Sequence, residues 1–135
     1  MNYAKTAYLE QKLLNHVFLG EEYTPPTTLY LALFTTNPGR VGDTSGEITD
    51  TAYARQAVTF TAAADEATSG SFVANVYDIE FPQATTGWGT VTHAMLMDAV
   101  TGGNGLYYGP LDIVKEITTN DFLKIPVGEL VVVED

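Results

Sequence analysis

Serine and histidine are the residues that a nucleophilic hydrolase would use, and the chain holds few of them. Serine occurs at Ser45, Ser69 and Ser71, each among loop-forming neighbours. His16 and His93 stand far apart in the sequence, and neither belongs to a spaced set of metal ligands. A Ser-His catalytic group needs a nucleophile, a base and an orienting acid in contact. The pattern therefore favours no catalytic residue of this kind.

Two pairs of carboxylates lie close enough in the sequence for glycosidic hydrolysis to be considered. Asp78 and Glu80 alternate with apolar residues and should point to solvent from a strand, while Glu134 and Asp135 end the chain. Charged side chains in such places are usually solvated. We expect neither pair to be catalytic.

The loop at 40–51 contains Asp43, Glu47 and Asp50, which offer the oxygen ligands that calcium prefers. It lacks the ligand spacing and the turn glycine of an EF-hand, so a flexible acidic loop is the alternative. The glycine-rich segment 101–105 has no following Lys-Ser/Thr and reads as a hairpin turn rather than a phosphate site. The sequence predicts no cofactor and no metal, and calcium at 40–51 stays open.

The composition restricts the class of protein and its partners. The chain has 135 residues and a mass of 14.6 kDa, which suits a single domain spanning 1–135. A net charge of −11 disfavours direct binding to nucleic acid. Cysteine is absent, so we expect no disulfides. The sequence shows neither a membrane-spanning apolar run nor a signal peptide, and we expect synthesis in the cytoplasm.

An amphipathic helix is predicted for Asn2–Leu19. Leu9, Leu13 and Val17 recur every four residues, and Leu14 and Phe18 widen the apolar stripe. A glycine and then two prolines follow, which should end the helix. One side of it must be buried, either on the protein's own β-domain or against an adjacent subunit.

The rest of the chain is predicted to form β-strands. The apolar run Leu29–Phe34 is expected to be the central strand, buried on both faces. Further strand signals lie at Tyr53–Thr61, Phe72–Phe81, Thr90–Val100, Leu106–Lys115, Asp121–Pro126 and Glu129–Glu134. With one helix and no crossover helices, these strands predict a mainly β fold, an antiparallel β-sandwich or barrel-like domain over 27–135 behind an N-terminal α-helix in 1–20.

Strand alternation also predicts which side chains are buried. In the segment Phe72–Phe81, one face should carry Val73, Tyr77, Ile79 and Phe81. The residues expected in the core are Leu31, Leu33, Val58, Phe60, Ile79, Phe81, Val91 and Val132.

A series of short motifs, in this order, resembles a family of small tailed-bacteriophage virion proteins, often labelled tail fibre-like or minor structural proteins. The motifs are Thr24-Pro25-Pro26, the run from Leu29 to Thr35, Asn37-Pro38-Gly39, Tyr53-Ala54-Arg55-Gln56, Phe81-Pro82-Gln83-Ala84, Trp88-Gly89-Thr90 and the segment from Leu106 to Leu111. The similarity covers nearly the whole chain and carries over no catalytic residue.

The resemblance implies a non-enzymatic structural protein of the virion, associated with the tail as a fibre or baseplate component and assembled as repeated subunits. Its partners would be other virion proteins and itself, as a homo-oligomer such as a trimer. The candidate assembly contacts are Leu9, Leu13, Val17, Arg55 and Trp88. Arg55 is expected to fork onto an acidic loop or a neighbouring subunit. Two alternatives remain open, namely a capsid decoration (cement) protein and a carbohydrate-binding module that uses Trp88 against a host-surface glycan.

Overall fold

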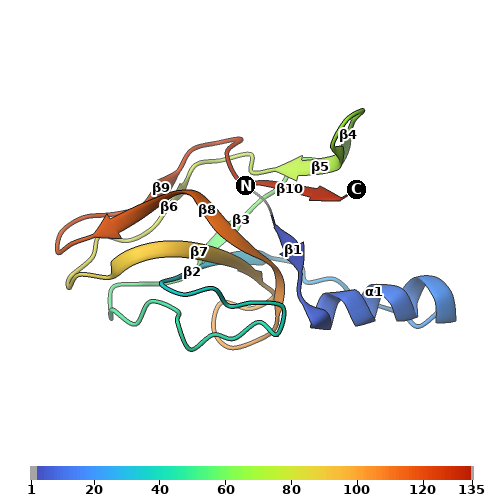
Figure 1. Cartoon of the computed structure of the whole chain (residues 1–135), viewed down its shortest axis with the longest axis horizontal. Coiled ribbons are helices and arrows are strands. Elements are labelled where there is room, and N and C mark those ends of the chain that lie inside the picture. Colours follow the sequence, from blue (N-terminus) through green and yellow to red (C-terminus); the bar gives the residue numbers. More distant parts are fainter. Residues whose placement is uncertain (1–2, 135) are drawn as a thin grey trace.

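The part of the chain that the structure describes consists of antiparallel β-sheets and one α-helix (Figure 1). The computed structural model describes residues 3–134. Its elements are β1 (Ala4–Lys5), α1 (Ala7–Leu19), β2 (Leu29–Phe34), β3 (Gln56–Val58), β4 (Ala64–Glu66), β5 (Gly70–Ala74), β6 (Ile79–Glu80), β7 (Gly89–Met97), β8 (Gly105–Ile117), β9 (Lys124–Ile125) and β10 (Val131–Glu134). The predicted mainly β, antiparallel fold with one helix near the N-terminus is confirmed.

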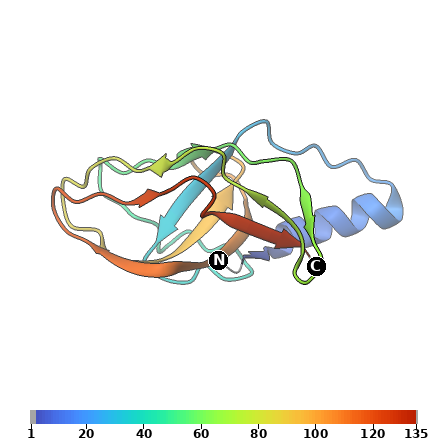
Figure 2. The same ribbon diagram turned by 90° about the horizontal axis from the view of Figure 1, so that it is seen from above.

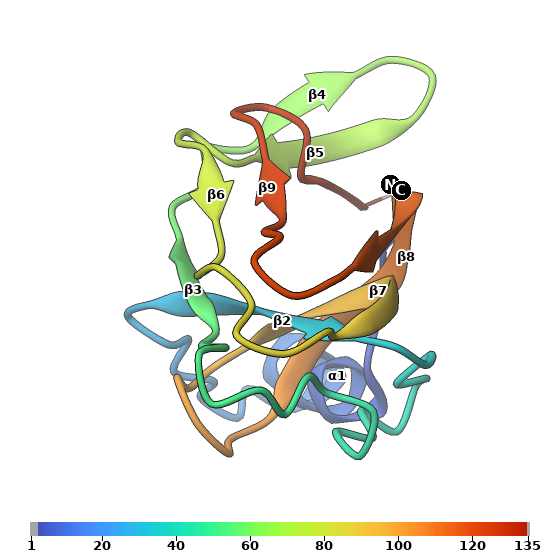
Figure 3. The same cartoon turned by 90° about the vertical axis from the view of Figure 1, so that its left-hand side faces the viewer.

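The strands form three sheets that enclose the main core. The largest has the order β1-β8-β7-β2-β3, the second has the order β10-β5-β4, and β6 pairs with β9. Figure 3 shows the five-stranded sheet on one side and β4 and β5 on the other, a sandwich-like arrangement. All of the predicted core residues are buried except Phe60, which is half-buried and packs against the core.

Strand β2 is buried on both faces, as its apolar run predicts. Leu31 and Leu33 point into the main core. The opposite face carries a second apolar cluster, which consists of Ala32, Phe34, Met95 and Met97. The loop after β2 passes over this outer cluster, because Gly42 lies directly against the Met95 side chain. The prediction that β2 is the central strand is wrong, since β7 has that place, between β8 and β2.

The predicted strand Phe72–Phe81 is in fact two strands, β5 and β6, and a buried side chain separates them. The amide nitrogen of Asn75 donates to the carbonyl oxygens of Tyr77, at 2.8 Å, and Pro126, at 3.0 Å. Its carbonyl oxygen accepts from the backbone nitrogen of Leu130, at 2.9 Å. These bonds replace strand pairing and interrupt the alternation. Tyr77, predicted to face the core, is therefore 71% exposed.

Further boundaries also differ from the prediction, and the strand predicted at Asp121–Pro126 is reduced to β9. The helix begins at Ala7 because Thr6 caps it and β1 precedes it, and Asn2 lies outside the described residues. The stretch expected to separate strands at 62–70 contains β4, which pairs with β5 as a short hairpin. The predicted strand Tyr53–Thr61 is reduced to β3. Such short strands carry too little apolar alternation to be recognised from sequence.

Candidate functional site

The first turn of α1 is fixed firmly to the β-domain. The Thr6 hydroxyl accepts a hydrogen bond from the backbone nitrogen of Leu9, as helix-capping residues do, and donates one of 2.6 Å to the carbonyl oxygen of Gly105. The Thr6 backbone nitrogen donates to Leu106 of the same strand, β8, at 2.8 Å. Leu9 is only 4% exposed. These contacts set the direction in which the helix leaves the sheet.

The loop after β2 holds the same end of the helix from the other side. The backbone nitrogen of Ala7 donates to the carbonyl oxygen of Arg40, at 2.8 Å. The Arg40 guanidinium forms an exposed ion pair of 2.6 Å with Glu10. Hydrogen bonds from the sheet and from the loop, together with this ion pair, therefore hold the first two turns of α1 in place.

The far end of α1 projects away from the β-domain, as Figures 1 and 2 show. Among the described elements, α1 contacts only β1 and β8. Gly20, with a φ of 70°, ends the helix in the left-handed conformation that glycine adopts without strain. Four apolar side chains at this end are more than half exposed, and we call them the helix tip: Leu14, Val17, Phe18 and Leu19.

The predicted apolar stripe of the helix is thus buried only at its start. Leu9 lies in the protein, Leu13 is half-buried, and Val17 is 70% exposed. The periodicity predicts that the stripe is covered, either by the β-domain or by an adjacent subunit, and the β-domain covers only its start. An apolar helix end of this kind on a projecting arm is unusual for a surface in contact with water.

Arg55, another predicted assembly contact, is buried and binds within its own chain. Its Nε and one terminal nitrogen grip the two carboxylate oxygens of Glu47, at 2.8 and 2.9 Å. The other terminal nitrogen donates to the carbonyl oxygens of Ala99, at 2.9 Å, and Gly102, at 2.8 Å, in the turn between β7 and β8. Arg55 therefore forks onto the acidic loop and also joins that loop to the β7–β8 turn.

Tyr53 extends this network to β2. Its hydroxyl donates to Glu47, at 2.8 Å, and accepts from the backbone nitrogen of Leu33, at 3.0 Å. Burial raises the pKa of Tyr53, and the neighbouring Glu47 carboxylate adds to this increase. The pKa of Arg55 is raised mainly by its hydrogen bond to Glu47. The tyrosine thus stays neutral and the arginine charged, which is the state that these hydrogen bonds require.

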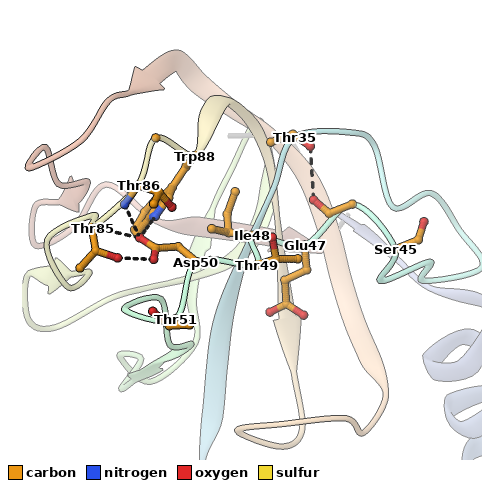
Figure 4. Close-up of a pocket in the computed structure, with 12 residues that line it drawn as sticks. Thr35, Ser45, Glu47, Ile48, Thr49, Asp50, Thr51, Thr85, Thr86 and Trp88 are labelled. Atoms are coloured by element: carbon orange, nitrogen blue, oxygen red, sulfur yellow. Dashed lines mark hydrogen bonds between the residues drawn. The ribbon is translucent and has the colours of Figure 1, made fainter.

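Trp88 is one of the residues that line a cavity of about 460 Å³, shown in Figure 4. Only 7% of Trp88 is exposed, and the rings of Tyr53 and Trp88 pack in a T-shaped arrangement, with 5.7 Å between the ring centroids and 89° between the ring planes. The indole nitrogen donates to Asp50, at 2.9 Å. Since the indole is buried and its polar group is already bound, Trp88 does not present an open aromatic face to a sugar.

Asp50 is the centre of the hydrogen bonds around this cavity. Its carboxylate accepts from the hydroxyl and the backbone nitrogen of Thr85, at 2.5 and 2.8 Å, and from the backbone nitrogens of Thr86 and Ala52. The hydrogen bonds of Thr85 and Trp88 hold the pKa of Asp50 well below its ordinary value. Asp50 therefore ties the acidic loop to the loop before β7 and has no acceptor capacity to spare.

The three acidic residues of the 40–51 loop do not form one cluster. Asp43 accepts from the backbone nitrogen of Ser45, Glu47 binds Arg55, and Asp50 binds Thr85. Across residues 3–134, no group of three or more His, Asp or Glu side chains is arranged to hold a metal ion.

The other residues considered for chemistry are also separate. His16 bonds to the carbonyl oxygen of Glu21 on the helix arm, and burial lowers the pKa of His93 within β7. Asp78 is exposed and pairs with Lys124, at 3.3 Å. Asp135 lies outside the described residues. In the part of the chain that the structure describes, no helix is long and apolar enough to span a membrane.

Comparison with protein families agrees with the motifs in the sequence. The family model for Podophage GP4 fiber I protein gp80 matches residues 4–133, from β1 to β10. The chain belongs to this family. No curated protein matches it. The resemblance to small virion structural proteins of tailed phages is confirmed, and the matched segment includes the helix tip and both polar networks.

The first prediction for this family member concerns Arg55. Replacement of Arg55 by Ala should lower the free energy of unfolding by about 3–5 kcal/mol, because it leaves the largely buried Glu47 carboxylate unpaired. Urea denaturation measures this change. Arg40→Ala, which breaks the exposed ion pair with Glu10, should cost no more than about 1 kcal/mol. Equal losses for the two variants would contradict the assigned role of Arg55.

The second prediction concerns the dependence of stability on pH. Because the pKa of Asp50 is lowered in the folded protein, its stabilising contribution is present above about pH 4 and is lost as the pH falls toward the folded-state value. Asp50→Asn should therefore lower the melting temperature at pH 7, and the difference from the unchanged protein should shrink in acid. Glu80→Gln, on the exposed face of β6, serves as the control. A difference that is constant from pH 7 to pH 2 would contradict the assignment.

Proposed function

We propose that this protein is a non-enzymatic component of the phage tail that joins the virion as a repeated subunit through its helix tip. In this proposal, residues 27–135 form the β-domain, and residues 1–20 carry the docking helix, within one domain. The family supports a structural role in the virion. The observation that carries the proposal is the exposed apolar end of a helix whose other end is held by Thr6 and Leu9.

The energetics favour burial of the tip in the assembled particle. Phe18 and Val17 are 76% and 70% exposed, and complete burial of such a side chain stabilises a contact by about 1.5–3 kcal/mol. The anchored first turns reduce the ordering that association would otherwise require. A stiff arm with an apolar end therefore suits a permanent contact between virion proteins.

In this proposal, the five candidate contact residues have two different roles. Leu13 and Val17 take part directly, together with Phe18. Leu9, Arg55 and Trp88 act within the chain, where they hold the helix and the loops in place. The partners are other virion proteins and further copies of the chain. Direct contact with nucleic acid is disfavoured by the net charge of −11.

A capsid decoration protein is the second candidate within the same structural class. The same helix tip would then bind the capsid. The number of copies per virion distinguishes a decoration protein from a tail component. Quantitative mass spectrometry of purified virions should find a few to a few dozen copies for a tail component and hundreds for a decoration protein. A carbohydrate-binding module receives little support, because Trp88 is buried and its indole nitrogen is bound.

The third prediction tests the helix tip directly. A phage that encodes the double variant Val17→Ser and Phe18→Ser should produce virions at least ten-fold depleted of the protein. The melting temperature of the isolated variant should be unchanged, because both side chains are exposed. The matched control, Ile113→Ser with Val114→Ser, removes two exposed apolar side chains from β8. Normal incorporation of the tip variant would refute the proposed docking role.

A further inference from the structure

A second apolar feature of the surface lies between the two larger sheets. It is a groove of about 310 Å³. Most of its walls are apolar, and they include Phe60, Ala63, Phe72, Val73, Leu106 and Val132. We call this feature the intersheet groove.

The polar groups at the edge of the groove are already bound. Glu134 accepts from Lys5, at 2.7 and 2.8 Å, and from the Tyr107 hydroxyl, at 2.5 Å. Burial and the hydrogen bond to Glu134 raise the pKa of Tyr107, so its hydroxyl stays neutral. An occupant would find apolar walls and few free hydrogen-bonding groups. The groove is therefore suited to apolar side chains such as those of the helix tip.

A chain cannot fill its own groove with its own helix tip. Figure 3 shows α1 on one side of the five-stranded sheet and β4 and β5 on the other. The groove lies on the same face of the five-stranded sheet as β5 and β10, because Val73 and Val132 of these two strands line it together with Leu106 of β8. Figure 1 shows that α1 runs outward from the body. A contact between tip and groove therefore requires two copies.

We propose that the helix tip of one copy occupies the intersheet groove of the next copy. This inference rests on the proposed function, in which the protein assembles as repeated subunits. The contact is heterologous, since one copy contributes the tip and the other the groove. Such contacts produce closed rings or open filaments, depending on the rotation between neighbours.

The tip and the groove match in chemistry. The four side chains of the tip are apolar, and each is more than half exposed. The walls of the groove are mostly apolar as well. A subunit inside a ring or filament uses both its tip and its groove, so each subunit makes two such contacts.

The charge of the chain gives this contact a characteristic response to salt. Two copies with a net charge of −11 each repel one another. Salt screens this repulsion and leaves an apolar contact intact. Self-association should therefore strengthen as the ionic strength rises, whereas a contact held by ion pairs would weaken.

The next prediction uses two variants that each lack one half of the contact. Phe18→Asp places a charge on the tip, and Ala63→Trp fills the groove from an exposed position. Analytical ultracentrifugation of the unchanged protein at high concentration should show oligomers. Each variant alone should associate at least ten-fold more weakly. An equimolar mixture should form a one-to-one dimer, because the intact tip of Ala63→Trp fits the intact groove of Phe18→Asp.

Matched controls keep this experiment decisive. Ile113→Asp and Ala62→Trp make the same changes at exposed positions outside the tip and the groove, and should associate like the unchanged protein. Ser71→Trp is a second exposed change that fills the groove, for use if Ala63→Trp does not fold.

Three results would overturn the inference: an unchanged protein that stays monomeric at high salt, a groove variant that associates normally, or a mixture without the dimer. If the Val17/Phe18 variant is nevertheless lost from virions, the tip binds another virion protein, and the proposed function stands while this inference fails. If virion incorporation is also normal, both fail.

Discussion

The need to cover the outer face of the five-stranded sheet governs the rest of the structure. Phe34, Met95 and Met97 point away from the main core and are still fully buried. Within residues 3–134 no second sheet lies over them, since the two smaller sheets are on the other side. The irregular loop after β2 and the start of α1 lie there instead, where Gly42 meets both Met95 and Thr6. Loop and helix therefore have to be fixed by specific contacts.

Polar networks supply this fixation, and they account for residues that resemble a functional site in the sequence. Arg55 and Glu47 hold the end of the loop to the β7–β8 turn, and Asp50 holds it to the segment before β7. A cation–carboxylate fork, a buried tryptophan and several acidic residues in one loop would also suit catalysis or ligand binding. Here their hydrogen bonds are used within the fold, and the exposed end of the helix carries the apolar side chains Leu14, Val17, Phe18 and Leu19.

The sequence predicts best what depends on local patterns. The run Leu29–Phe34 indicates burial on both faces, and the helix stripe indicates an amphipathic helix, because both follow from side-chain periodicity. The contacts of Asn75 and Asp50 could not be predicted from such patterns. The Asn75 side chain interrupts a strand by forming hydrogen bonds with backbone groups about 50 residues away. Asp50 accepts a hydrogen bond from Trp88, which lies 38 residues further along the chain. Long-range pairings of this kind leave no periodic signal in a single sequence.

The helix pattern likewise predicts only part of the function. Amphipathicity predicts that one face is covered but not by what, and the structure covers only the first turns. The chain belongs to a phage fibre family. Under the proposed function, a neighbouring virion protein covers the exposed remainder of the helix. Rigid anchoring at one end and an apolar surface at the other are what a subunit needs to join an assembly in a defined orientation.

The most direct test of this account uses the absence of cysteine from the chain. A single Leu19→Cys substitution places one reactive thiol on the helix tip, and Val41→Cys, at a position 83% exposed in the loop after β2, provides a reference. The rate of maleimide labelling is measured in the free protein and in intact virions. The thiol at position 19 should react readily in the free protein. In the virion its labelling rate should fall, relative to the labelling rate of the thiol at position 41. Equal labelling of position 19 in both states would contradict the central claim that the helix tip is buried on assembly.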